Sequence, residues 1–597
     1  MALVTTNDIL SVAKPIRLLG GHWLAKKVLR WLALDKANIL YDLLIQSEVK
    51  DYDALQKILD KLPVHYQINA AALAAIPTTG PFITISNHPF GSIDGIILAH
   101  AIAKIRPDYK LVVNFLLNKI EPINSYFIPV NPFEEHKDKF NSTSGIRNTI
   151  AHVRNGGGLG LFPAGEVSSF SLKTLTVSDI EWPDQIIKLV KSLSVPVIPI
   201  YFEGRNSKRF HILGLLHPRL RTARLANEMF NKANKTLRIQ VGKPISVDTQ
   251  AIFTDLQEYK HFLRSKLYAQ KLALSGNEEP KLVSTVQAEK IIDPIAVDVL
   301  LTELASLETY QLFKLKEYTV YCVPTTAMPN IMTEIGRLRE ITYREVGEGT
   351  NKSIDIDKFD AHYHQMFIWN ETDKRIVGAY RIGYGRELLQ INGLKSFYIN
   401  SLFQIKRPLE PLMNDAIELG RSFVVKEYQR KATPLFLLWK ALFVILVKDD
   451  YRYLIGPVSI SGKFSDTAKA LVTVFLRKNY FNEAFAQHIK NRIKKGFDVP
   501  NEIDIETFLR ITNKDFAKLD AFIQDFDPQY TTPILVRQYI SLLKTEIIGF
   551  NVDPDFNYCL DALMLMDIKG TPKAFMESLS KDLKDLSKVE SLLSELE

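Results

Sequence analysis

Short apolar runs alternate with amphipathic stretches through residues 82–245. The β-type runs are FITIS (82–86), LVVNFLL (111–117), GLGLFP (158–163), VPVIPIYFE (195–203) and LRIQVG (237–242). Helical patterns such as IDGIILAHAIAKI and SDIEWPDQIIKLVKSL lie between them. This alternation of strands and helices predicts an α/β layer architecture for the N-terminal half of the chain.

The pattern changes after residue 318. Five further strands are predicted, at YTVYCV (318–323), MFIWN (366–370), IVGAYRIGYG (376–385), FYINSLF (397–403) and YLIGPVSI (453–460). A helix-like segment, NIMTEIGRLREITYREVG, follows the first of them, and another, LFLLWKALFVILVK, precedes the last. A helix, an antiparallel meander, and then a helix and a strand predict a C-terminal α+β domain.

The chain is also too long, at 597 residues, for a single hydrophobic core. A polar loop, SGNEEPK (275–281), follows a long polar helix and marks the best candidate boundary. We therefore expect an amphipathic helical segment at residues 1–50, an α/β domain at 51–280 and an α+β domain at 281–597.

The N-terminal segment IRLLGGHWLAKKVLRWLAL has the composition of an interfacial helix. Its apolar face comprises Leu24, Val28, Trp31 and Leu32, and its cations are Lys26, Lys27 and Arg30. Trp with Lys and Arg beside an apolar stripe is typical of helices that lie on a membrane, although a helix packed on its own domain can have the same pattern. No stretch reaches the roughly 18–20 apolar residues of a spanning helix, and no signal-peptide pattern is present.

Charge and cysteine content narrow the choice of partners and compartment. The net charge is 75 − 67 = +8 and the sequence pI is about 9.0, which suits an acidic partner such as nucleic acid, an anionic lipid surface or an acidic carrier protein. The two cysteines, Cys322 and Cys559, lie far apart without CxxC spacing. They fit a reducing compartment and argue against a disulfide framework or a zinc site.

A first chemical motif, ISNHPFGSIDG (85–95), lies where a strand ends and a helix begins. There the carboxylate of Asp94 can fix the tautomer of His88 and support the imidazolium that forms when the ring takes a proton. Turns are rich in such residues for backbone reasons as well, so the motif alone does not decide. Three further segments favour a functional site over a simple turn: SYFIPVNPF (125–133), LFPAGEVSS (161–169) and VPVIPIYFEGRNS (195–207).

The order and spacing of these four blocks resemble the lysophosphatidate acyltransferase family over roughly residues 70–250. The resemblance implies that His88 acts as general base on an acceptor hydroxyl, which then attacks an acyl thioester, and that Asp94 orients the imidazole. It also implies that the acceptor site is lined by Asn87, Asn131, Gly165 and Glu166.

The match departs from the family pattern at three points. Five residues separate His88 from Asp94 where the family has four, Asn131 and Pro132 stand in place of the second block's arginine, and Glu166 and Val167 replace a Thr-Arg pair. An acceptor without a glycerol phosphate would explain the missing cations.

Polar residues also gather in four segments of the C-terminal half. These are REITYREVGEG (339–349), DIDKFDAHYH (355–364), VGAYRIGYG (377–385) and DAIELGRSFV (415–424). Their acidic residues are Asp355, Asp357 and Asp360, and Glu418 and Arg421 are spaced so that they could pair on a helix or at the entry to a strand. Taken separately, such clusters are usually solvated loops or structural pairs.

Together the four segments resemble the ornithine-lipid N-acyltransferases, distant relatives of the acyl-homoserine-lactone synthases and of the N-acetyltransferase (GNAT) superfamily. The resemblance extends to TPILVRQYISLL and GFNVDPDF within residues 532–556. It implies that Asp355, Asp357 and Asp360 receive the substrate ammonium, that Glu418 or a nearby carboxylate helps to deprotonate it, and that three arginines contribute to the site. The arginines are Arg344, Arg381 and Arg421. The amine must be neutral to attack a thioester, because its lone pair is the nucleophile.

The loop KEYQRKATP (426–434) lies where N-acetyltransferases place a glycine-rich pyrophosphate loop. It has no glycine and carries Arg430 and Lys431, which favours acyl carrier protein over free acyl-CoA as the donor. Neither half shows a metal site or a nucleotide fingerprint, so we expect no cofactor beyond the acyl thioester co-substrate.

The sequence therefore predicts a bifunctional acyltransferase that makes an aminolipid. Its C-terminal half N-acylates ornithine or glycine with a 3-hydroxyacyl group, and its N-terminal half then O-acylates the lyso-lipid hydroxyl. The expected partners are acyl carrier protein, the amino acid, the lyso-aminolipid and the inner face of the cytoplasmic membrane, and not nucleic acid. Two alternatives stay open: a lysophospholipid O-acyltransferase with a non-catalytic C-terminal domain, and a membrane-active, hemolysin-like binding protein.

Overall fold

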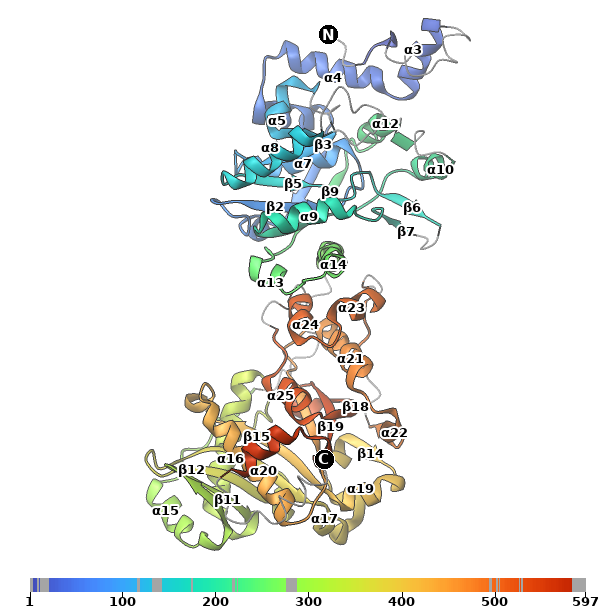
Figure 1. Cartoon of the computed structure of the whole chain (residues 1–597). Helices are drawn as coiled ribbons and strands as arrows, with labels where there is room; N and C mark the ends of the chain where they lie inside the picture. The colour runs from blue at the N-terminus through green and yellow to red at the C-terminus, as the bar shows by residue number, and fades with distance from the viewer. Residues whose placement is uncertain are drawn as a thin grey trace. The chain divides into compact units, whose positions relative to one another are not determined.

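The chain folds into two compact units (Figure 1). The first comprises Met1–Glu278 and Asn501–Asn513, and the second comprises Glu279–Pro500 and Lys514–Glu597. The computed structural model describes the whole chain except residues 1–3, 8–9, 11–20, 115–118, 131–141, 173–175, 217–220, 223, 275–286, 493–495, 501–502, 504, 525–526, 528–529 and 582–597. The predicted boundary loop at 275–281 lies outside the described residues.

A seven-stranded sheet forms the centre of the first unit. Its strands, in spatial order, are β1 (His65–Ile68), β9 (Thr236–Val241), β8 (Val197–Phe202), β2 (Phe82–Ser86), β5 (Gly158–Leu161), β3 (Lys110–Asn114) and β4 (Phe127–Val130). All neighbours are parallel except β8 and β9. The five predicted strands are confirmed where they are described, since residues 115–117 of the second lie outside the described residues. Strand β2 is buried along its whole length between β8 and β5, so the motif that follows it emerges at the middle of the sheet.

Helices and a hairpin complete this unit. They are α3 (Gly21–Trp31), α4 (Leu34–Gln46), α5 (Asp51–Lys61), α6 (Ala70–Leu73), α7 (Ser92–Ala103), α8 (Ser142–Arg154), α9 (Asp184–Leu193), α10 (Lys208–Leu216), α12 (Leu225–Phe230), α13 (Val247–Ala251), α14 (Leu256–Leu274), α23 (Ile505–Thr512) and the hairpin β6 (Ser169–Ser171) and β7 (Thr176–Ser178). α7 is apolar on all sides and buried, whereas α14 packs on β8, β9 and α9 and also against α23.

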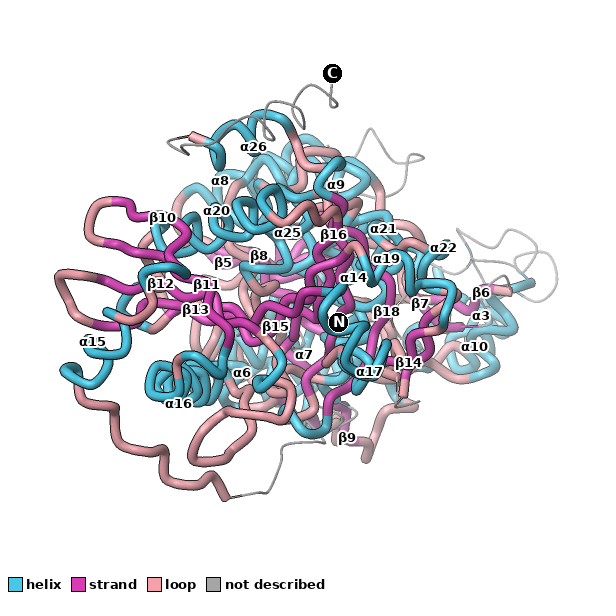
Figure 2. The backbone as a smooth tube through the Cα atoms, turned by 90° about the horizontal axis from the view of Figure 1, so that it is seen from below, coloured by secondary structure: helices cyan, strands magenta, loops and turns pink. Residues whose placement is uncertain are grey.

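An eight-stranded sheet forms the centre of the second unit. Figure 2 draws the strands of the chain in magenta. Its order is β10 (Gln311–Leu315), β11 (Tyr318–Pro324), β12 (His364–Asn370), β13 (Arg375–Tyr384), β15 (Ala416–Val424), β16 (Tyr453–Ile460), β19 (Cys559–Asp567) and β18 (Glu546–Asp553). The helices are α15 (Val297–Ala305), α16 (Pro329–Val346), α17 (Gly385–Asn392), α18 (Ile399–Leu402), α19 (Glu410–Asn414), α20 (Ala432–Lys448), α21 (Asp466–Tyr480), α22 (Glu483–Ala486), α24 (Phe516–Ile523), α25 (Ile534–Leu543) and α26 (Lys573–Ser580).

The sheet opens between its two parallel strands. β15 and β16 pair only from Ala416–Glu418 to Tyr453–Ile455. Beyond that point β15 continues along β13 to Val424, and β16 continues along β19 to Ile460. The two strands therefore part just after Glu418, and their facing backbone groups no longer pair with each other.

One predicted strand, FYINSLF (397–403), is wrong. The segment forms the short helix α18 and then β14 (Phe403–Ile405), which pairs with β17 (Ile489–Asn491) in a separate two-stranded sheet. The backbone N–H groups of Tyr398 and Ile399 donate to the Glu418 carboxylate, so they cannot join a β-ladder. The apolar residues that suggested a strand are buried in the core instead.

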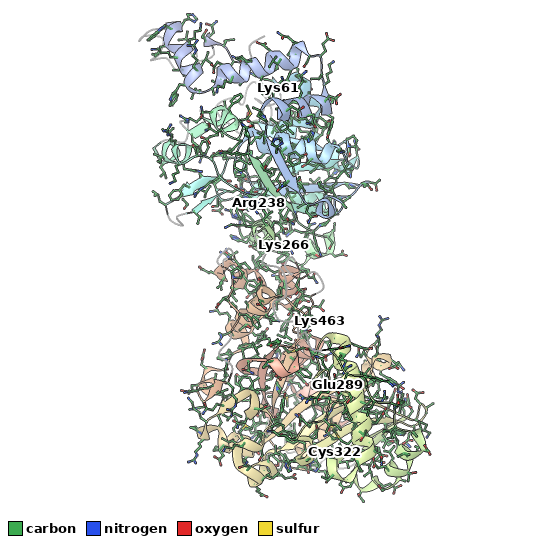
Figure 3. The ribbon with its side chains drawn as sticks, turned by 180° about the vertical axis from the view of Figure 1, so that it is seen from behind. Lys61, Arg238, Lys266, Glu289, Cys322 and Lys463 are labelled. Atoms are coloured by element: carbon green, nitrogen blue, oxygen red, sulfur yellow. The ribbon has the colours of Figure 1, made fainter. Side chains whose placement is uncertain are left out.

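The N-terminal helix α3 leaves its aromatic residues in solvent. Trp23 is 65% exposed and Trp31 is 53% exposed, while Ala25 and Leu29 are buried. Lys27 lies over the Trp23 ring at 3.8 Å. In the described part of the chain, no helix is long and apolar enough to cross a bilayer. Both cysteines are unpaired and buried, with Cys322 on β11 in the second unit (Figure 3).

Candidate active sites

His88 and Asp94 meet at the end of β2. The Nδ1 of His88 lies 3.0 Å from Asp94 Oδ2, and the aspartate is fully buried while the imidazole is 18% exposed. The same carboxylate oxygen accepts the backbone N–H groups of Phe90 and Gly91 at the start of α7. Asp94 is thus fixed by the turn, and it holds the His88 tautomer that leaves Nε2 free to accept a proton.

The backbone and one face of His88 are also fixed by neighbouring segments. The imidazole stacks on Phe162 with the ring centroids 4.2 Å apart. Ser168 donates its backbone N–H to the His88 carbonyl at 2.8 Å, and Asp179 accepts the His88 N–H and the Ser168 hydroxyl. Burial raises the pKa of Asp179. The third block therefore wraps around the histidine of the first.

The other residues predicted for this site have different surroundings. Asn87 is buried, and its side chain bonds both backbone groups of Phe202, so it joins β2 to β8. Gly165 has a φ of +68° in the tight turn before Glu166, a conformation that favours glycine. Glu166 is largely exposed and accepts a hydrogen bond from Arg221 at 2.7 Å. Asn131 lies outside the described residues.

Arg221 is a cation of this site that none of the sequence motifs includes. Its side chain is nearly buried and reaches the block that contacts His88 through its ion pair with Glu166. His211, on α10, lies close enough to Arg221 and Arg205 for their charges to act on it, and both of its ring nitrogens are buried without a hydrogen-bond partner. Burial first, and then the Arg205 charge, lowers the pKa of His211. The signal in the sequence is the basic run HPRLRTAR (217–224) between β8 and β9.

Glu418 forms the centre of the second site. It is 1% exposed and accepts three hydrogen bonds: from Tyr363 Oη at 2.5 Å, Ile399 N at 2.8 Å and Tyr398 N at 3.1 Å. Burial raises its pKa to about 7, although the hydrogen bonds favour the ionised form. Glu418 is the last residue of β15 that pairs with β16, so the opening in the sheet begins beside it.

A balanced ion network adjoins this carboxyl. Its members are Arg339, Arg381 and Arg421 with Asp355, Asp357 and Asp360. Arg381 Nη1 is 2.8 Å from Asp357, and Arg421 Nε is 3.0 Å from Asp355. Asp355 and Asp360 are sealed from solvent, whereas the Asp357 side chain is 25% exposed. Burial opposes ionisation of Asp360, but the charges of Arg339 and Arg381 hold its pKa below the usual range.

Glu418 and Arg421, whose spacing would allow a pair, have different partners in the structure. Both residues lie on a strand, where the bonds described above direct Glu418 to Tyr363 while Arg421 turns to Asp355. The register between β13 and β15 shifts beside Arg421, whose φ is +50°. This left-handed conformation costs a non-glycine residue about 1–2 kcal/mol, and the surrounding ion pairs stabilise it.

The remaining predicted residues have partners outside the Glu418 network. Arg344 bonds Glu340 and the backbone carbonyls of Glu289 and Lys352, so it ties two loops to α16. Arg430 and Lys431 are exposed just before α20, and the Lys431 ammonium lies over the Tyr428 ring. In the described residues, no group of three His, Cys, Asp or Glu side chains is arranged to hold a metal ion.

Two tyrosines and one arginine complete the second site, and the motifs did not single them out. The Arg381 guanidinium lies over the rings of the buried Tyr363 and the partly buried Tyr398, at 5.2 and 4.8 Å from their centroids. Arg339 donates to Asp360 and Gln365. Tyr363 and Arg339 lie within the polar segments, so their positions were visible, but their roles depend on contacts made by the fold.

Comparison with known protein families agrees with the two units. A family model described as an acyltransferase matches residues 13–277, and one described as an acetyltransferase (GNAT) domain matches residues 338–439. The predicted combination of an acyltransferase domain with a GNAT domain is confirmed.

Similar proteins carry related names. A glycine N(alpha)-acyltransferase of Phocaeicola vulgatus is 27% identical over 47% of this chain and 83% of its own length. A lyso-glycine lipid O-acyltransferase of the same organism is 26% identical over 36% of this chain and 77% of its own. The crystal structure of the 1-acyl-sn-glycerophosphate acyltransferase of Thermotoga maritima aligns with 14% identity over 39% of this chain and 86% of that chain, with a TM-score of 0.24. The chain is thus an acyltransferase that joins an N-terminal acyltransferase domain to a C-terminal GNAT domain.

Proposed function

We propose that this protein makes a glycine lipid by two successive acyl transfers. One observation carries the proposal: a single chain is similar both to proteins named for glycine N-acylation and to proteins named for O-acylation of a lyso-glycine lipid. The GNAT domain would acylate the glycine amine with a 3-hydroxyacyl group. The acyltransferase domain would then acylate the hydroxyl that this group supplies, so the chemistry runs in the reverse order of the domains.

His88 is the proposed base of the O-acyl transfer. Its Nε2 takes the proton of the acceptor hydroxyl, the oxygen attacks the thioester carbonyl, and the C–S bond breaks as the proton passes to the leaving thiolate. Asp94 stabilises the imidazolium across the 3.0 Å hydrogen bond. The lyso-lipid carries a carboxylate and no phosphate, and Arg221 is the cation we assign to it, because its present partner Glu166 is largely exposed and can be displaced.

Glu418 is the proposed proton acceptor of the N-acyl transfer. Glu418, whose carboxyl accepts a hydrogen bond from the Tyr363 hydroxyl, takes up the proton that the substrate ammonium releases. The neutral amine attacks the carbonyl carbon of the second thioester, the C–S bond breaks, and the proton lost by the acylated nitrogen passes to the leaving thiolate. A carboxyl with a pKa of about 7 suits this role, because a substantial fraction is ionised at neutral pH and the ionised form is basic enough to take a proton.

The acyl donor is proposed to be acyl carrier protein, and the reaction to take place at a membrane surface. The exposed Arg430 and Lys431 suit an acidic carrier, and Trp23 and Trp31 suit the lipid interface. No further cofactor is required, since a thioester is already activated for acyl transfer.

Labelled amino acids test the proposal in a heterologous host. Cells expressing the protein are fed labelled glycine or labelled ornithine, and the lipids are separated by thin-layer chromatography. We expect the label of glycine in two new lipids, one mono-acylated and one di-acylated. Label from ornithine alone would show that the acceptor is wrong, and the absence of any amino-acid-labelled lipid would contradict the whole proposal.

The donor is tested separately with the purified protein. Acyl carrier protein and CoA carrying the same 3-hydroxyacyl group are compared by kcat/KM, in the wild type and in a variant with both Arg430 and Lys431 changed to Glu. We expect the carrier to be preferred and the charge reversal to reduce its use by at least tenfold while leaving CoA use nearly unchanged. Equal use of both donors by the wild type would contradict the assignment.

A further inference from the structure

A second acidic group lies one strand beyond the opening in the GNAT-domain sheet. Asp561 stands opposite Asn551 in the register of β19 with β18, and opposite Ser459 in the register with β16. Asp553 is two residues from Asn551, so it projects from the same face of the sheet. Asn551 and Asp553 belong to the segment GFNVDPDF, to which the proposed mechanism assigns no role, and Asp561 follows on β19.

Tyr398 joins this group to the Glu418 site. Its backbone N–H donates to Glu418 at 3.1 Å, and its hydroxyl lies 3.4 Å from Asp553 Oδ2. The same hydroxyl is 3.2 Å from Arg421 Nη1. The acidic group and Glu418 therefore lie on one face of the sheet, separated by a single tyrosine side chain.

Asp561 lacks the charge partner that a buried carboxylate requires. It is 2% exposed and accepts the Ser459 hydroxyl at 2.7 Å, and it forms no ion pair with a cation in the described part of the chain. Burial above all, and then the nearby Asp553 and Glu348 carboxyls, raises its pKa far from its ordinary value, against the smaller effect of Arg421. A cation placed beside it would remove this penalty.

Asn551 provides independent evidence that a hydrogen-bond donor is missing. The residue is 2% exposed and its Nδ2 donates to the Val552 carbonyl, whereas its Oδ1 is buried without a partner. A buried amide oxygen that accepts no hydrogen bond costs about 1–3 kcal/mol, so such atoms usually face a ligand or a water molecule. This oxygen is on the face that also carries Asp561.

The other acidic cluster is a poorer receptor for an ammonium. Asp355, Asp357 and Asp360 are matched by three arginines, so the network is already neutral. An ammonium added there would have to displace a guanidinium, whereas one added beside Asp561 would meet a carboxyl that forms no ion pair within the described residues and the unbonded Oδ1 of Asn551.

We propose that Asp561, Asp553 and the Oδ1 of Asn551 bind the α-ammonium group of the amino-acid substrate. An ammonium has three N–H donors, which matches two carboxylates and one amide oxygen. The adjacent carboxylate of an α-amino acid lies toward Arg421, whose three hydrogen bonds leave two of its five N–H groups for a further acceptor. This inference rests on the proposed glycine N-acylation and identifies the groups that bind its amino-acid acceptor.

Asp561→Asn tests this ammonium-binding group in the full-length protein. The substitution keeps the shape and the Ser459 contact but removes the charge, so we expect KM for glycine to rise about 10- to 100-fold, with a smaller change in kcat. Asp567→Asn is the matched control, because Asp567 lies at the exposed end of the same strand and pairs with Arg452. Folding of the second unit, which carries Asp561, is checked by comparing the circular-dichroism spectrum and the thermal unfolding of each variant with those of the wild type.

The outcomes separate this inference from the proposed function. If the wild type N-acylates glycine and Asp561→Asn has an unchanged KM for glycine, the proposed ammonium-binding group is wrong and the proposed function stands. A wild type that does not acylate glycine overturns the function itself. If Asp561→Asn fails to fold, Asp553→Asn replaces it: a tenfold or larger rise in KM for glycine supports the ammonium-binding group, and a KM within twofold of the wild type overturns it.

Discussion

Replacing Asp94 by Asn perturbs the first site with minimal change of shape. The carboxylate oxygen Oδ2 accepts hydrogen bonds from His88 at 3.0 Å, Phe90 at 2.9 Å and Gly91 at 3.1 Å. An asparagine oxygen in this position preserves all three contacts but removes the negative charge that stabilises the imidazolium. An asparagine NH₂ turned toward the ring forces the opposite tautomer on His88, with its proton on Nε2.

The size of the effect follows from the hydrogen bond that changes. A hydrogen bond to a charged group is worth about 1.5–3 kcal/mol, which is about 10- to 100-fold in rate at about 1.4 kcal/mol for each factor of ten. A shift of tautomer adds to this, and the corresponding substitution in serine proteases costs about 10⁴-fold. We therefore expect kcat for O-acylation to fall by at least tenfold and at most about 10⁴-fold.

The assay follows thiol release from the acyl donor with synthetic N-(3-hydroxyacyl)glycine as acceptor. Glycine N-acylation by the same preparation is the internal control, because the second site does not involve Asp94. In cells, Asp94→Asn and His88→Ala should both accumulate the mono-acylated lipid. An O-acylation rate within threefold of the wild type in Asp94→Asn would refute the role given to this pair.

Three further predictions concern the second site, the acceptor cation and the N-terminal helix. Burial raises the pKa of Glu418 to about 7, so the ionised, basic form of the carboxyl becomes more populated as the pH rises. The rate of N-acylation at saturating glycine should therefore increase about tenfold from pH 6 to pH 8. The Glu418→Gln variant should be slow and should not show this increase with pH. Arg221→Ala should raise KM for the lyso-lipid about tenfold but not KM for its methyl ester, and an equal rise for both would contradict a carboxylate contact. Changing Trp23 and Trp31 to Ala should weaken sedimentation with anionic vesicles at least tenfold; unchanged sedimentation would exclude α3 as the contact.

Much of the fold could be predicted because the hydrophobic pattern records the burial of each strand. FITIS and VPVIPIYFE read as strands and are buried strands, since a central parallel strand is covered on both faces. FYINSLF was wrong because its backbone donors are bonded by Glu418, a residue that follows in the sequence and meets it only after folding. Periodicity contains no information about such a contact.

The contacts within the candidate sites could likewise be predicted only where the residues lie close together in the sequence. His88 and Asp94 are close in sequence, so a turn suffices to bring them together. Arg221 and Asp561, in contrast, lie 55 residues from Glu166 and 102 from Ser459, the partners that place them. Neither residue lies in a motif that the sequence analysis singled out, and only the folded structure shows that Arg221 pairs with Glu166 while Asp561 accepts a hydrogen bond from Ser459.

The path of the chain limits how the protein can be divided. Asn501–Asn513 belongs to the first unit although it is flanked on both sides by segments of the second, so the polypeptide passes between the units three times. Its helix α23 packs against α14 and buries Phe508 and Ile511. A truncation near residue 280 would strip α14 of this cover and leave an apolar stripe open to aggregation. Fragments made to isolate one activity therefore need residues 501–513 supplied with the N-terminal piece, as a fused or co-expressed peptide.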